Sequence, residues 1–90
     1  DRRRQEAERR ARLQPLRAEL TKLETALDRA SADMARLKSQ LADPSLYLET
    51  QKPRLKELLR EQTSLKQTLA ATEEAWLALS EQLAAAEQEP

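Results

Sequence analysis

The sequence predicts an all-α protein, a two-helix antiparallel coiled-coil hairpin with a left-handed supercoil. Three observations support this fold class. Charged residues make up 36% of the chain, which contains no Gly, Cys or Phe, and this composition is typical of long helices. Apolar residues recur at alternating steps of three and four in two stretches, the 3.5-residue period of a left-handed coiled coil. A short proline-containing segment separates the stretches and can only reverse the chain.

The first coiled-coil helix is predicted over residues 13–42, with a kink or a fresh helix start near Gln14, because Pro15 disrupts the preceding turn. Residues 1–12 have no apolar face, since Glu6 and Arg9 occupy the extrapolated core positions, and are expected to form a loosely held basic lead-in. The apolar a and d positions of this helix form an unbroken seam: Leu13, Leu16, Leu20, Leu23, Leu27, Ala30, Met34, Leu37 and Leu41.

The connection is predicted over residues 43–52 and the second helix over residues 53–88. Asp43 and Pro44 read as the N-cap and the first helical residue of a single short turn. Tyr47 either closes the end of the hairpin or makes an exposed contact, whereas Trp76 occupies an a position and is expected in the core. The second seam contains two polar positions: Leu55, Leu58, Gln62, Leu65, Leu69, Thr72, Trp76, Leu79, Leu83 and Ala86.

Two registers keep a positions opposite d positions. One sets Leu41 near Gln51 and brings Arg17 close to Glu73. The other sets Leu41 near Leu58 and places two glutamates opposite each other. Because flanking charges steer coiled-coil pairing, the first register is preferred, although each exposed pair contributes only about 0.2–1 kcal/mol.

Several classes of function are disfavoured by the residues that the sequence lacks. Without Cys it has no thiolate metal site, and without His it lacks the usual zinc ligand and the common general base near neutral pH. It has no glycine-rich phosphate loop and no apolar run that approaches about 20 residues. We therefore expect no catalytic residue, cofactor or metal in this chain, no membrane contact and a cytoplasmic location. Asp1 in place of an initiator Met suggests a piece of a longer protein.

Basic residues gather in two regions, near the predicted turn and in the lead-in. Arginine suits phosphate contacts through its planar fork of donors, and cations on two helices near one tip could grip a nucleic-acid backbone without reading its sequence. The alternative is that these charges keep a rod soluble and offset the acidic C-terminal helix. The candidate nucleic-acid-binding residues are Arg9, Arg10, Arg12, Arg17, Arg36, Lys38, Lys52, Arg54, Lys56 and Arg60.

The order of several short stretches resembles the C-terminal domain of ABC-F ATPases, the Uup-like family. These stretches are Leu-Gln-Pro-Leu-Arg-Ala-Glu-Leu at 13–20, Leu-Glu at 23–24, Leu-Ala-Asp-Pro-Ser-Leu-Tyr at 41–47 and Ala-Trp-Leu at 75–77. The arginine-rich lead-in is similar to the segment that joins this domain to the second ATPase cassette. The resemblance implies a DNA-binding coiled-coil hairpin of a tandem-cassette protein, many relatives of which act on ribosomes, with ATP bound by the parent. It supplies no site residues.

The leading hypothesis is therefore a non-catalytic accessory hairpin that binds DNA or ribosomal RNA and contacts its own ATPase cassettes. The competing hypothesis is a structural interaction module without nucleic-acid binding. In that case a thin two-helix core would pack against the parent or form a weak homodimer through leftover apolar residues such as Leu48 and Leu59.

Overall fold

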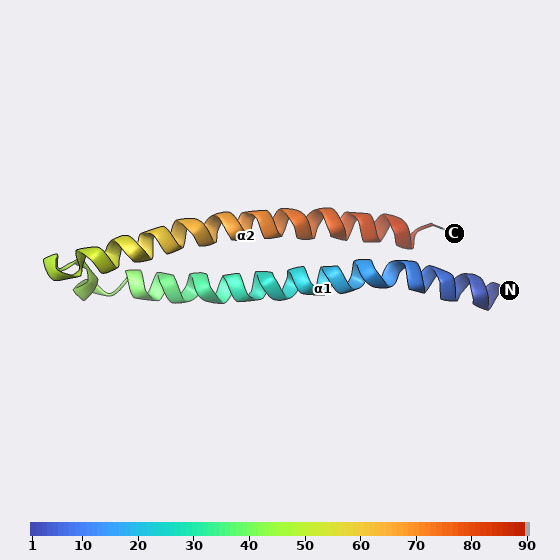
Figure 1. Ribbon diagram of the computed structural model, residues 1–90, viewed down its shortest axis with the longest axis horizontal. Coiled ribbons are helices and arrows are strands. Elements are labelled where there is room, and N and C mark those ends of the chain that lie inside the picture. The colour runs from blue at the N-terminus through green and yellow to red at the C-terminus, as the bar shows by residue number, and fades with distance from the viewer. Residues whose placement is uncertain (90) are drawn as a thin grey trace.

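The computed structural model describes residues 1–89, which form two long helices folded back on each other as a hairpin (Figure 1). Helix α1 covers Arg2–Leu41 and α2 covers Lys52–Glu87. Two short 3-10 helices, η1 (Pro44–Tyr47) and η2 (Glu49–Gln51), make the connection. The molecule is a rod of 73 × 16 × 15 Å. The predicted fold class is confirmed, and both chain ends lie at the end of the rod opposite the turn (Figure 1).

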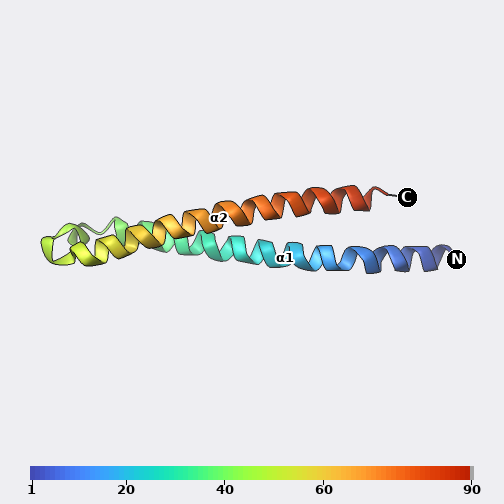
Figure 2. The ribbon, with the colours of Figure 1, turned by 45° about the horizontal axis from the view of Figure 1, so that its top comes forward.

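The predicted seams hold the two helices together. Every seam residue from Leu13 to Leu41 and from Leu55 to Ala86 is buried or half-buried. Figure 2 shows α2 inclined across α1 near the turn, so that the contact follows a stripe along each helix. A stripe of this kind buries few residues. The buried residues within 1–89 are Leu13, Ala30, Leu37, Leu58 and Leu83 on the helices and Leu46 in the connection.

The best-packed part of the core lies beside the turn. Leu37, Leu46 and Leu58 form a buried cluster, and the side chains of Leu37 and Leu58 are only 0% and 1% exposed. Leu46 comes from η1, so the connection itself contributes a core residue. Three half-buried leucines pack around this cluster: Leu41, Leu55 and Leu65.

Helix α1 passes Pro15 without interruption, so no new helix starts near Gln14. Figure 1 shows its axis bending gently in the blue N-terminal stretch, as expected where proline removes a backbone hydrogen bond. The lead-in is continuous with α1, and its first eight residues are exposed. The start of the lead-in extends beyond the end of α2 (Figure 1), so it has no second helix to pack against, although it is helical itself.

The preferred register is wrong. Arg17 pairs with Glu87 rather than lying near Glu73, and Arg36 pairs with Glu61. Together with the contact between Leu37 and Leu58, these pairs lie close to the second register. The physical reason is visible at the turn, where the first part of α2 extends beyond the end of α1 (Figure 1). Leu46 packs beneath this overhang, and its burial outweighs two exposed charge pairs.

Candidate nucleic-acid interface

The turn is fixed by hydrogen bonds from side chains of its own residues. The Asp43 carboxylate accepts hydrogen bonds from the backbone N–H and the hydroxyl of Ser45, both at 2.9 Å, as expected of the N-cap of η1. The backbone hydrogen bond from Ser45, followed by the hydroxyl bond, lowers the pKa of Asp43. The predicted capping role of Asp43 and Pro44 is confirmed. The cap fixes the backbone of the connection between the basic residues at the end of α1 and those at the start of α2.

Tyr47 combines both roles that its position allowed. Its hydroxyl donates a 2.6 Å hydrogen bond to the carbonyl of Leu41, which is one of the orphan acceptors at the C-terminal end of α1. The residue nevertheless stays 61% exposed, and the adjacent Leu48 is 59% exposed. The tip thus closes the hairpin while presenting apolar surface.

Three of the predicted basic residues near the turn are engaged in ion pairs. Arg36 contacts Glu61 at 2.7 Å and also donates to Gln40 at 3.0 Å. The hydrogen bond to Glu61, followed by its charge, raises the pKa of Arg36. Lys52 pairs with Glu49 at 2.9 Å, and Arg54 pairs with Glu57 at 3.1 Å, each within one helical turn. All these groups are accessible, so each pair contributes little to stability.

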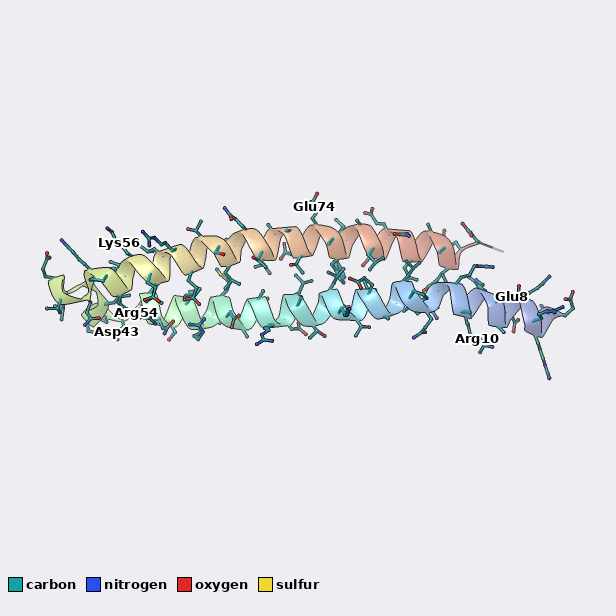
Figure 3. All side chains as sticks on the ribbon, viewed as in Figure 1. Glu8, Arg10, Asp43, Arg54, Lys56 and Glu74 are labelled. Carbon is teal, nitrogen blue, oxygen red and sulfur yellow. The ribbon has the colours of Figure 1, made fainter. Side chains whose placement is uncertain are left out.

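Lys38, Lys56 and Arg60 differ from these three because they make no ion pair within residues 1–89. All three are exposed. Lys56 and Arg60 are four residues apart, which places them on one face of α2. Figure 3 shows Lys56 on the outer side of α2, directed away from α1. This face of α2 therefore offers two neighbouring cations to a partner.

Polar side chains that were not among the predicted residues continue this outer face. An open hollow is lined by Lys56, Leu59 and Arg60, together with Thr63, Ser64 and Gln67. Hydroxyl and amide groups commonly contact phosphate and sugar oxygens. Charge alone does not reveal these neighbours, but helical spacing from Lys56 and Arg60 predicts them.

The basic residues of the lead-in lie at the opposite end of the rod. Arg9 donates a hydrogen bond to the backbone carbonyl of Glu87, and Arg17 lies 3.3 Å from the Glu87 carboxylate. Arg10 and Arg12 are exposed. Figure 3 places Arg10 far from Arg54 and Lys56, so the ten predicted residues form two separate groups. In the group at the open end, Arg9 and Arg17 join α1 to the end of α2.

Within residues 1–89 there is no cluster of three or more acidic residues that could hold a metal ion. No helix in this part of the chain is both long and apolar enough to cross a membrane. The open hollows that the structure shows lie on the surfaces of the rod. The arrangement of the described residues is suited to surface contact.

Comparison with known proteins identifies the family. Residues 15–81 match the family model described as the ABC transporter C-terminal domain. No curated protein and no solved structure matches the chain. The matched region begins at Pro15, includes both 3-10 helices of the turn and covers most of α2. It corresponds to an accessory domain, distinct from the ATP-binding cassette. The chain therefore belongs to the family of ABC transporter C-terminal domains.

Proposed function

We propose that this chain is the accessory hairpin of an ABC-F type, Uup-like tandem-cassette ATPase, and that its tip binds DNA or ribosomal RNA through phosphate contacts. The hairpin itself carries no catalytic step in this proposal. ATP is bound and hydrolysed by the cassettes of the parent protein, in the cytoplasm. The order of the sequence motifs supports the ABC-F assignment within the wider family.

The observation that carries the proposal is the pair of exposed cations Lys56 and Arg60 on the outer face of α2. They are one helical turn, about 6 Å, apart along the helix axis, so both can reach the backbone of one strand. Lys52, four residues before Lys56, extends the row of like charges. Like charges at this spacing destabilise a helix by a few tenths of a kcal/mol. An anionic partner would convert this cost into binding energy.

The charge distribution along the chain also favours the turn end of the molecule as the contact for a polyanion. Between Met34 and Arg60 the chain has six basic residues and three acidic ones, whereas residues 67–89 have five glutamates and no Lys or Arg. A polyanion approaching along the rod is repelled by the distal part of α2 and attracted at the turn. The tip is therefore our first choice for the contact, and the lead-in with Arg10 and Arg12 is our second.

A salt titration of binding to duplex DNA and to ribosomes, run in parallel, tests the proposal. Affinity should fall linearly with salt on logarithmic axes, because bound phosphates release their counterions. Replacing Lys56 and Arg60 together by Gln should reduce the slope by about 2, since each phosphate that a cation neutralises on duplex DNA adds about 0.9 to it. The comparison between the two ligands then shows which nucleic acid is preferred.

A matched control is the replacement of Lys22 and Arg29 by Gln, since these residues are exposed, lie in the middle of α1 and make no ion pair within residues 1–89. The net-charge change is identical, so the control should leave most of the slope intact. If both double variants reduced the salt slope equally, the contact could not be assigned to the tip. If neither ligand bound at low salt, the proposed function would be wrong.

A further inference from the structure

One side of α2 carries two leucines that the hairpin does not bury. Leu59 is 45% exposed and Leu77 is 53% exposed. They are 18 residues apart, which is five full helical turns and about 27 Å along the axis, so both lie on the same side of α2. Thr63, Lys66, Ala70 and Glu73 fall between them within about 40° of the same line. We call these six positions the lateral stripe.

Helix α1 adds a receiving surface at one end of the lateral stripe. An open, largely apolar hollow is lined by Leu27 of α1 and by Glu73, Trp76 and Leu77 of α2. Trp76 is half-buried, and its indole nitrogen has no hydrogen-bond partner within residues 1–89. A single leucine side chain fits such a hole between two helices in the manner of a coiled-coil knob.

We propose that a second copy of this chain binds along the lateral stripe, with the two α2 helices antiparallel. Leu59 of each copy then packs into the hollow lined by Leu27, Trp76 and Leu77 of the other. The contact is isologous, because the same surface is used by both copies around a two-fold axis. Ala70 lies near this axis, where a small side chain lets the two helices approach closely. The result is a four-helix arrangement.

The charges on the lateral stripe favour a second copy as the occupant. With Leu59 level with Leu77 of the second copy, Lys66 lies about 4.5 Å along the axis from Glu73 of that copy, within reach of a lysine side chain. The two-fold axis repeats this pair. A parallel arrangement in the same register would set Lys66 against Lys66 and Glu73 against Glu73. Neither residue makes an ion pair inside the hairpin within residues 1–89.

The test uses charge reversal in the 90-residue chain, followed by sedimentation equilibrium over a range of protein concentrations. Lys66→Glu sets four carboxylates along the interface, and Glu73→Lys sets four ammonium groups there. Each variant alone should associate at least about tenfold more weakly than the unmodified chain, since like charges in register oppose association. An equimolar mixture should recover the association as a heterodimer, because every charge then meets its opposite.

The double variant Lys66→Glu with Glu73→Lys should recover association by itself for the same reason. Leu77→Ala should also weaken the dimer, whereas Leu48→Ala, a change at an equally exposed leucine outside the lateral stripe, should not. Circular dichroism at low concentration checks that every variant keeps its helices. Trp76, the only tryptophan, gives an independent readout, with its fluorescence shifting to shorter wavelength as concentration rises.

An unmodified chain that stays monomeric at millimolar concentration would overturn the proposal. So would a dimer that is insensitive to both charge reversals, or a mixture that associates no better than its components. This inference is independent of nucleic-acid binding, because its readout is the mass of the protein in the absence of any ligand.

Discussion

The two ends of the rod are held together by different kinds of interaction. At the turn, Leu37, Leu46 and Leu58 form a buried cluster, and the ion pair between Arg36 and Glu61 spans the two helices beside it. At the open end, Leu13 and Leu83 are buried outside this cluster. There, contacts from Arg9 and Arg17 to Glu87 connect α1 to α2. Both ends thus combine buried leucines with ion pairs between the helices, but only the turn has a contiguous cluster of three buried leucines, so the open end depends more on exposed polar contacts.

This difference has a consequence for stability along the molecule. Apolar burial contributes about 25 cal/mol per Å² removed from water, whereas an exposed ion pair contributes between zero and about 1 kcal/mol. Local opening is expected where buried contacts are few. The hairpin should therefore fray from the end that carries the termini and remain closed at the turn.

The largest expected effect comes from removing apolar volume at the turn. Leu58→Ala should lower the free energy of unfolding by about 2–5 kcal/mol, because it leaves a cavity in the best-packed cluster. The corresponding change at the open end, Leu83→Ala, should cost about 2 kcal/mol or less, since that end can open locally. Urea unfolding followed by circular dichroism measures both. Equal losses would show that the two ends are equally well packed.

A smaller effect is expected from the hydrogen bond between Tyr47 and Leu41. Tyr47→Phe keeps the ring and removes the donor, so the carbonyl at the end of α1 no longer has this partner. The free energy of unfolding should fall by about 1 kcal/mol in the same urea experiment. Hydrogen exchange should become faster at the amides that follow α1, while the amides near Leu83 keep their rates. A uniform increase along the rod would contradict the assignment of this bond to the turn.

The smallest effect is expected from acid. The pKa of Asp43 is lower in the folded state than its ordinary value, because Ser45 donates hydrogen bonds to the carboxylate. Its contribution to stability is therefore present above the ordinary pKa and is lost as the pH falls through the lowered one. The measurement is the free energy of unfolding of the unmodified chain and of Asp43→Asn between roughly pH 2 and 6, where carboxyl groups titrate. The difference between the two curves is the contribution of Asp43. If the two chains showed the same dependence of unfolding free energy on pH, Asp43 would make no such contribution.

The sequence predicted the fold through one strong regularity. The heptad spacing from Leu13 to Leu41 and from Leu55 to Ala86 predicted the residues that the hairpin buries or half-buries, because a coiled coil converts sequence period directly into contact. The capping role of Asp43 was also readable, since it depends only on neighbours along the chain. Local rules and periodicity were sufficient for both features.

The register could not be read in the same way. It depends on how Leu46 packs beneath the overhang of α2, and no heptad position describes a residue in the connection. Charge pairs were the only available guide, and each is too weak to decide against a buried leucine. The predicted binding residues met a similar limit. Lys56 and Arg60 were predicted from their charge. The pair of Arg54 with Glu57 lies within one helical turn and was readable from the sequence, whereas the pair of Arg36 with Glu61 spans the two helices and required the folded arrangement.

The placement of both termini at one end of the rod has a mechanical meaning. Any segment joined to the chain at that end holds the turn up to 73 Å away, and a stiff pair of helices transmits a small rotation at the base into a large displacement of the tip. For a flexible attachment, the tip is confined to a thin shell around its anchor. This confinement raises its effective concentration for targets at that radius and lowers it for nearer ones. The length of the two helices thus determines the distance from the anchor at which the tip can make contacts.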